Sequence, residues 1–232
     1  CAQAWAGEQK TADLPVLIEV VDDDAHVERL LPILDEMLTG GALVSTKGGS
    51  DDLVTLEEFG DFEFEFEWKA TEKANSGVMY RVLEMDAPSW NSGPEYQVLD
   101  DGHSQGEREA LLHAAAAIYD VQPTEVSPRA AGEWNQGRIL VQGWKVEHFL
   151  NGKLAAACDF GSADGKARVA KSKFSGMPQF MASSRGHIAL QNHGDEVAYR
   201  NIRVRPIGAR TIALFNGKDF GGWKWVAGEP AA

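Results

Sequence analysis

The clearest pattern in the chain is an alternation of aromatic and acidic residues between positions 62 and 68. Its members, in order, are Phe62, Glu63, Phe64, Glu65, Phe66, Glu67 and Trp68. Successive side chains of a β-strand point to opposite faces, so this period of two predicts four rings on one face and three carboxylates on the other. Runs at 77–82 and 95–99 predict two more strands. We expect the three strands to be neighbours in one sheet, with an apolar face for the core and a polar face for water or a ligand.

Short runs of strand character continue along most of the chain. They lie at 42–45, 53–55, 61–69, 77–82, 96–99, 137–142, 145–150, 153–157, 187–191 and 197–205. Asn151-Gly152 separates two of these runs and is the dipeptide that best fits a two-residue hairpin turn. About a dozen short strands at this spacing favour an all-β fold, a jelly-roll sandwich of two antiparallel sheets.

Both ends of the chain differ from this pattern. Residues 14–21 predict a strand, and apolar residues at helical spacing between Val27 and Leu38 predict a helix that stops at Gly40-Gly41. The tail at 211–225, TIALFNGKDFGGWKW, predicts a strand, a turn and a Trp-rich segment. We therefore predict a strand–helix appendage or foreign segment at 1–40, a β-sandwich at 41–207 and a separate segment at 208–232.

Charge and cysteine content narrow the choice of partners. The formal net charge is −13 and the sequence pI is near 4.9, which disfavours nucleic acid and anionic membrane surfaces as partners. No apolar run reaches the roughly 18 residues of a membrane span, and no signal peptide is visible. Cys1 and Cys158 are too few for a disulfide framework. A cysteine at position 1 is consistent with the acylated Cys1 of a mature lipoprotein, and equally with an arbitrary start.

Several sequence motifs occur in an order that identifies a family. They are LVTLEEFGDFEFEFEWK, NSGVMYR, EYQVLDD, GEWNQGRILVQGWKVEHFLNGKLA and GHIALQNHGDEVAYRNIRVRPI. Together, over roughly 41–207, they resemble the 3-keto-disaccharide hydrolase family, formerly a domain of unknown function. The resemblance implies a concanavalin A-like, laminin-G-type (LamG) sandwich. In that family the segment resembling LFNGKDFGGWKW opens the domain, whereas here it closes the chain. A circular permutation, the start of a second copy, or a chimera would each explain this displacement.

The resemblance implies a glycoside-processing hydrolase that acts on 3-keto sugars. A ketone at C3 acidifies the hydrogen on C2, so a base can remove that proton and expel the C1 substituent, after which water adds to the enone. This route needs a base of near-neutral pKa, a group that polarises the C3 oxygen and an acid for the leaving group. The residues alone do not separate it from hydrolysis by two carboxylates. A non-catalytic carbohydrate-binding module and an incomplete fragment are the alternatives. A periplasmic or extracellular location is also implied.

The candidate catalytic residues lie where the strand at 95–99 runs into a loop. Glu95 and Gln97 share one strand face, and Asp100, Asp101 and His103 follow. We predict Glu95 and His103 as the acid/base pair, with Asp100 orienting or ligating, because histidine titrates near neutral pH. Asp100, Asp101 and His103 could also hold a divalent metal ion, and no other cofactor is predicted. The alternative is a polar sheet face beside a solvated loop.

A second set of polar and aromatic residues is predicted to bind the sugar. Arg81 could bind sugar hydroxyls or stabilise an enolate, or it could pair with one of the strand glutamates. Trp90 lies in a Ser/Asn/Gly-rich loop and is a candidate stacking platform. The connection at 102–129 is long enough to be functional beside a sheet face. The predicted substrate-binding residues are Glu67, Asn75, Arg81, Trp90, Gln97 and His193.

Overall fold

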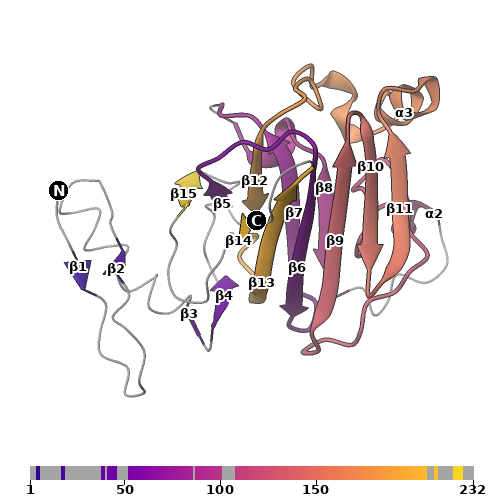
Figure 1. Cartoon of the computed structure of the whole chain (residues 1–232). Coiled ribbons are helices and arrows are strands. Elements are labelled where there is room, and N and C mark those ends of the chain that lie inside the picture. Colours follow the sequence, from indigo (N-terminus) through magenta and orange to yellow (C-terminus); the bar gives the residue numbers. More distant parts are fainter. Residues whose placement is uncertain are drawn as a thin grey trace.

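Two antiparallel β-sheets pack face to face in the computed structural model of the chain (Figure 1). The structure describes residues 41–45, 52–85, 87–100, 108–207 and 222–226, and the backbone of short strands at 4–5, 17–18, 38–39 and 212–213. One continuous hydrophobic core lies between the sheets and draws residues from both. The all-β sandwich that the sequence predicts is therefore confirmed.

The larger sheet contains eight strands and the smaller contains five. The larger runs in the order β11 (Lys153–Asp159), β10 (Lys145–Leu150), β9 (Asn135–Gln142), β6 (Phe62–Ala70), β13 (Val197–Pro206), β4 (Ala42–Ser45) and β3 (Leu38–Thr39), with β14 (Ile212–Ala213) also paired to β13. The smaller runs in the order β15 (Trp223–Val226), β5 (Asp52–Thr55), β12 (His187–Leu190), β7 (Asn75–Val82) and β8 (Glu95–Leu99). A separate pair joins β1 (Ala4–Trp5) to β2 (Leu17–Ile18). The described helices are α2 (Arg108–Leu111) and α3 (Ala163–Val169), and the 3₁₀ turns are η1 (Ser89–Asn91) and η2 (Lys173–Gly176).

The alternating stretch forms β6 and faces the core as predicted. Its four rings are buried, and they contact tyrosines of the facing sheet: Phe66 lies 5.2 Å from the Tyr96 ring and Phe62 lies 6.3 Å from the Tyr80 ring. The prediction that β6, β7 and β8 share one sheet is wrong, because residues 71–74 carry the chain from the larger sheet to the smaller. A period of two assigns the faces of a strand and leaves its neighbours open.

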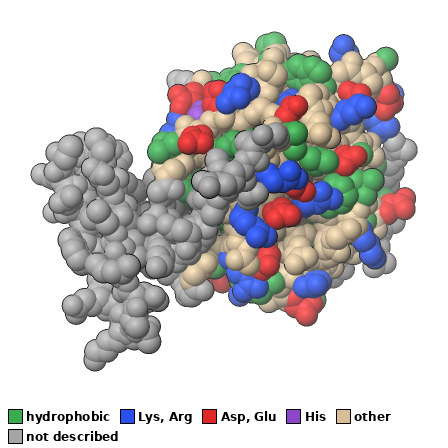
Figure 2. All heavy atoms as spheres, viewed as in Figure 1, with side chains coloured by type: hydrophobic (Ala, Val, Ile, Leu, Met, Phe, Trp, Pro, Cys, Tyr) green, Lys and Arg blue, Asp and Glu red, His purple; other side chains and the backbone are tan. Residues whose placement is uncertain are grey.

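The outer face of the larger sheet is a ladder of ion pairs. Three glutamates of β6 point outward between arginines of β9 and β13. Glu63 pairs with Arg138 and Arg205, Glu65 pairs with Arg203, and Glu67 pairs with Arg200. Acidic and basic side chains accordingly lie side by side over these strands in Figure 2. The arginines hold the pKa of Glu63 below its usual value, since hydrogen bonds favour the charged carboxylate. Glu63 and Glu65 thus have the solubilising surface role expected of them.

The Asn-Gly turn signal was reliable, and α2 lies within the short helical piece predicted near 107–117, whereas α3 gave no signal. Asn151-Gly152 joins β10 to β11, with φ of 50° and 80°, as the hairpin prediction requires. The unpredicted helix α3 begins after Ser162, whose hydroxyl accepts a hydrogen bond from the Gly165 N–H at 3.0 Å. Its seven residues are too few for a hydrophobic period to show. The helix predicted between Val27 and Leu38 lies almost wholly outside the described residues, and the predicted domain limits remain predictions.

The C-terminal segment contributes strands to both sheets. β15 pairs with β5 over four residues, and the Trp223 side chain is buried in the core. β14 pairs with Arg203 and Val204 of β13, while β4 pairs with the same strand near Val197. The C-terminal strands β14 and β15 are therefore part of the sandwich, as β3 and β4 are, whereas β1 and β2 form a separate pair.

Candidate active site

The smaller sheet carries a buried carboxyl group on the face turned away from the core. Tyr96 and Val98 of β8 point into the core, so Glu95 and Gln97 point to the opposite face. Glu95 is only 4% exposed. Its side chain leans over Gly77 of β7, where an added Cβ would lie 2.7 Å from the Glu95 Cδ. The missing side chain at Gly77 therefore creates the space that the carboxyl group occupies.

Burial sets the acidity of this carboxyl group. Removal from water raises the pKa of Glu95 to about 8, because the charged form loses hydration. The positive charge of Lys173 acts in the opposite direction, and the negative charge of Asp52 on β5 adds to the rise. A carboxyl group with such a pKa exchanges its proton close to neutral pH, as a general acid or base requires.

Lys173 lies among aromatic rings beside Glu95. Its ammonium group is 4.3 Å from the centre of the Trp90 ring and 4.5 Å from that of Tyr119, and it also lies over Phe174. Trp90 belongs to η1 and Lys173 begins η2, so two separate turns bring these groups together. Rings in this arrangement hold a cation through their π-electrons and can also stack on a sugar.

The connection after β8 adds a further strand-like edge to the smaller sheet. The Tyr119 N–H donates to the Glu95 carbonyl at 3.1 Å, and the Ala116 N–H donates to the Gln97 carbonyl at 2.8 Å. Behind it, the His148 Nδ1 lies 3.2 Å from the Ala116 carbonyl; burial lowers the pKa of His148 to about 3, so this imidazole is uncharged. Residues 116–119 of the connection are therefore held between β8 and β10, and the functional role of the connection stays a prediction.

A carboxylate in this connection joins an imidazole to a backbone N–H group. One oxygen of Asp120 lies 3.1 Å from the His113 Nε2, and the other accepts the Lys173 backbone N–H at 2.6 Å. The His113 ring stacks on Tyr119 with centres 4.6 Å apart. Asp120 thus couples the position of η2 to the orientation of an imidazole. We call Glu95, His113, Tyr119, Asp120 and Lys173 the Glu95 cluster.

Two of the predicted substrate-binding residues lie beside this cluster. The Gln97 side chain donates to the Asn75 Oδ1 at 3.0 Å, and the Asn75 N–H donates to Asp195 at 3.0 Å. The Gln97 Oε1 is buried and, among the described residues, has no hydrogen-bond partner. An unpartnered buried acceptor costs stability, so this oxygen is suited to accept from a ligand hydroxyl. Trp90 is the third predicted residue that the structure brings here.

Three predicted residues lie away from the cluster. Glu67 is on the outer face of the other sheet, bonded to Arg200 at 2.7 Å. Arg81 is buried and pairs with Asp61 at 3.5 Å, rather than with a glutamate of β6. Its backbone is irregular, with a φ of 55°, and it lies opposite the register shift between His187 and Ile188. This irregularity turns the Arg81 side chain away from the polar face of the sheet. Asp100 accepts the Lys73 N–H at 2.9 Å and stands roughly 16 Å along the strand from Glu95. None of them can act on a group held at Glu95.

The remaining predicted residues cannot be assigned to the cluster. Asp101 and His103 lie outside the described residues. His193 is exposed in the turn that follows β12, next to Gly194, whose N–H donates to the Asn192 side chain. Within the described ranges, no group of three or more His, Cys, Asp or Glu side chains is placed to hold a metal ion. The metal prediction stays a prediction.

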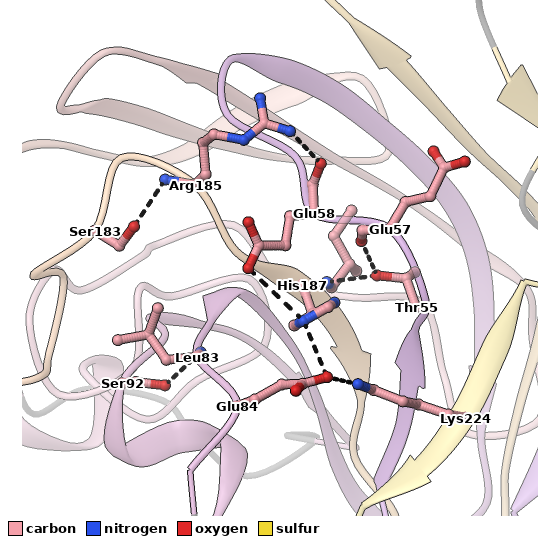
Figure 3. A network of polar contacts seen from close by, with 11 residues as sticks. Thr55, Glu57, Glu58, Leu83, Glu84, Ser92, Ser183, Arg185, His187 and Lys224 are labelled. Atoms are coloured by element: carbon pink, nitrogen blue, oxygen red, sulfur yellow. Dashed lines mark hydrogen bonds and ion pairs between the residues drawn. The ribbon is translucent and has the colours of Figure 1, made fainter.

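A second polar network occupies another part of the smaller sheet. The buried His187 directs its Nε2 toward Glu84 at 3.6 Å and Glu58 at 3.9 Å, and Glu84 also pairs with Lys224 of β15 (Figure 3). The Thr55 hydroxyl accepts the Ile188 N–H at 3.0 Å just below it. This network ties the C-terminal strand to β12 and the segments beside it, so we regard it as structural.

Sequence reasoning missed the residues that complete the Glu95 cluster. Lys173 comes from a segment far from β8 in sequence, whereas His113 lies in the connection that follows β8, and neither segment has a periodic pattern. The one available signal was the Tyr119-Asp120 pair within a long connection. Their approach to Glu95 depends on how the sandwich places η2 against η1, which no local pattern encodes.

Fold and site together define a β-sandwich protein with a buried carboxyl group beside a lysine and aromatic rings. A family model described as a 3-keto-alpha-glucoside-1,2-lyase-like domain matches residues 3–205, and the chain belongs to that family. A curated 3-keto-disaccharide hydrolase of Bacteroides thetaiotaomicron is 31% identical over 189 residues, which are 72% of this chain and 64% of that protein. The chain thus spans less than two thirds of the length of this relative.

Two solved structures from Parabacteroides distasonis share the fold. The first, a candidate glycosyl hydrolase, has a TM-score of 0.65 and 29% identity, covering 72% of this chain and 81% of that one. The second, also a candidate glycosyl hydrolase, has a TM-score of 0.59 and 24% identity, covering 72% of this chain and 88% of that one. Within the described residues, no helix is long and apolar enough to cross a bilayer.

Proposed function

We propose that the chain is a glycoside-processing enzyme that cleaves 3-keto sugars by elimination followed by hydration. The observation that carries the proposal is the buried Glu95 carboxyl group beside the Lys173 ammonium, on a sheet face flanked by Trp90 and Tyr119. Family membership and the curated relative's name support a 3-keto-glycoside as substrate. A carboxyl group of ordinary acidity would be a weak base for a C–H proton, whereas one with a pKa near 8 is better matched.

The proposed chemistry begins with the ionised Glu95 removing the proton from C2. The electron pair of the C2–H bond moves toward C3, and the negative charge that develops on the C3 oxygen is stabilised by the Lys173 ammonium. The resulting enolate expels the oxygen substituent at C1, which leaves with a proton and gives an enone. Water then adds at C1, and the products are the free 3-keto sugar and the released alcohol.

The other members of the cluster have supporting roles in this scheme. Asp120 orients His113 through Nε2, so that His113 is the candidate proton donor for the leaving oxygen. The Trp90 ring offers a stacking surface for the sugar, and the Gln97 Oε1 offers an acceptor for a hydroxyl group. His113 is partly exposed, so a leaving group that receives its proton there can pass directly into solvent.

Incubation with a 3-keto-glucoside tests the proposal, with the 3-keto-glucal intermediate followed by mass spectrometry. We expect turnover by the wild type, with kcat/KM rising with pH toward about 8 as Glu95 ionises. Glu95→Gln should lose at least about 100-fold in kcat, as is typical when a general base is removed. Glu65→Gln, on the ladder of the other sheet, is the matched control and should remain active. Turnover by Glu95→Gln at the wild-type rate would contradict the proposed role.

Binding of the sugar without turnover would instead indicate a carbohydrate-binding module. Such a module needs the Trp90 platform and hydrogen bonds but no titrating carboxyl group. In that case Glu95→Gln would leave the affinity unchanged, and Trp90→Ala would weaken it. Measuring both turnover and sugar affinity for these variants therefore separates the two functions.

We also propose that the C-terminal segment takes the structural place of the strand that opens the family's domain. The pairing of β15 with β5 and the buried Trp223 support this, although the neighbour is β5 rather than the strand at 42–45. Removal of residues 208–232 should then destabilise the whole sandwich, seen as a lower Tm. A periplasmic or extracellular location remains a proposal from the family resemblance, and cell fractionation would test it. A lipid on Cys1 remains a proposal from the cysteine at that position, and mass spectrometry of the native protein would test it.

A further inference from the structure

A cavity of about 580 Å³ lies beside the turn η2, and none of the residues that line it belongs to the Glu95 cluster. It forms where the turn between β9 and β10 meets α3 and residues 175–181, at the end of β11 where α3 stands in Figure 1. The residues that decide its chemistry are Trp144, Phe160, Lys166, Ser175, Phe180 and Met181. Its volume falls in the range of small-molecule sites, which run from about 300 to 1,000 Å³.

The floor of this cavity is apolar and fixed. Phe160, Phe180 and Met181 are buried, and the first two rings meet edge to face at 6.1 Å. Phe180 also stacks on Phe174 with ring centres 4.0 Å apart, and the Met181 N–H donates to the Ser92 carbonyl at 2.8 Å. A surface that is already ordered binds a ligand without a large loss of conformational freedom.

Trp144 forms a wall whose ring remains accessible. It is 39% exposed, although its carbonyl accepts the Phe160 N–H at 2.9 Å and so holds the turn in place. The guanidinium of the buried Arg81 lies 5.4 Å from the centre of the Trp144 ring and supports it from the protein interior. Gly161 leaves room for this ring, since a Cβ there would be 3.2 Å from the Trp144 Cβ. The indole is thus held in position with one side open.

Lys166 contributes a positive charge to the lining of this cavity in a strongly acidic chain. Lys166 of α3 makes no ion pair with any carboxylate among the described residues, whereas Arg168 of the same helix pairs with Asp164 at 2.7 Å. The Ser175 hydroxyl and the Trp144 indole N–H are further side-chain polar groups of the lining. The lining thus combines aromatic surface with a few polar groups, which suits a ligand that has an apolar ring system and one charged group.

We propose that this cavity is a second ligand site, which binds a planar aromatic carboxylate. The rings of the ligand lie against Trp144, Phe160 and Phe180, and its carboxylate meets the Lys166 ammonium and the Ser175 hydroxyl. The inference does not rest on the function proposed above, because no residue of the Glu95 cluster lines the cavity.

Calorimetric titration of the full chain with 2-naphthoate tests the proposal, with 2-naphthylmethanol as the uncharged counterpart. We expect one 2-naphthoate per chain. Lys166→Met should weaken 2-naphthoate about threefold to fivefold, as an exposed ion pair would, and leave 2-naphthylmethanol unchanged. Trp144→Ala should weaken both compounds by roughly tenfold. Lys153→Met, at the far end of β11, and Glu95→Gln should both bind like the wild type.

Three results would overturn the proposal. The first is that the wild type shows no saturable binding of 2-naphthoate. The second is that Trp144→Ala and Lys166→Met both bind it as tightly as the wild type does. The third is that Glu95→Gln loses binding, which would place the ligand in the other site. Thermal melting of each variant shows whether it is folded. Lys166 is exposed on α3, so its variant supplies the decisive comparison even where Trp144→Ala is unstable.

Discussion

Replacing Glu95 by glutamine should make the protein more stable at neutral and alkaline pH. The amide has nearly the same shape as the carboxyl group and never ionises. Glu95 is buried beside Gly77, and its burial raises its pKa from 4.5 to about 8. At neutral pH the unfolded chain therefore loses this proton while the folded chain keeps it, which lowers the free energy of unfolding. The substitution removes this loss of stability.

The size of the effect follows from the two pKa values. Below pH 4.5 both states hold the proton, so ionisation costs the folded state nothing. Between pH 4.5 and about 8 the unfolded chain ionises while the folded one does not, and stability falls as the pH rises. At about 1.4 kcal/mol for each pKa unit, the loss is about 3 kcal/mol at pH 7 and about 5 kcal/mol above pH 8.

Urea unfolding at intervals between pH 4 and pH 9, followed by tryptophan fluorescence, measures this difference. The free energy of unfolding of Glu95→Gln minus that of the wild type should rise from near zero at pH 4 to about 3 kcal/mol at pH 7. Glu65→Gln is the matched control: Glu65 is half exposed and pairs with Arg203 at 3.1 Å, so its difference should stay within about 1 kcal/mol at every pH. A constant difference for Glu95→Gln between pH 5 and pH 8 would refute the reasoning.

Two further substitutions test the placement of the site. Gly77→Ala should lower kcat/KM by roughly 100-fold, because the new methyl group displaces the Glu95 carboxyl group. Gly176→Ala is the control and should have no effect, because the space around Gly176 is open. Steady-state kinetics on a 3-keto-glucoside compares the two variants. Arg81→Met should leave kcat/KM within about threefold, since Arg81 faces Asp61 inside the sandwich. A large loss on Arg81→Met with an unchanged Tm would return that residue to the site.

Local patterns predicted the strands and turns of the sandwich well. The predicted limits of β10, 145–150, are those of the structure, and the turn at Asn151-Gly152 joins the expected strands. Both follow from neighbouring residues alone, through alternation and through backbone angles that few residues adopt. The pairing of β6 was wrong because its rings would suit either sheet. The strands after β6 belong to the smaller sheet because the chain passes from one sheet to the other at 71–74. This passage has no sequence signature.

The site was only partly predictable for a related reason. Glu95 was found because it lies on the polar face of a strand, which alternation reveals. Arg81 was misplaced because a single backbone irregularity reverses the face of every residue beyond it. Lys173 acts on Glu95 through tertiary packing of separate turns, and His113 joins the cluster through its contacts with Asp120 and Tyr119. A sequence can thus indicate where a polar face lies, while its completion depends on contacts between distant segments.

The energetics of Glu95 bear on why this position holds an acid. A glutamine would fill the same space over Gly77 without a titration cost, so the carboxyl group is the less stable choice at neutral pH. The ladder glutamates of the other sheet differ, because arginines stabilise their charged forms. A position that sacrifices stability for a near-neutral pKa has the property that proton transfer requires. The same burial that weakens the fold therefore gives Glu95 the near-neutral pKa that the proposed proton transfer requires.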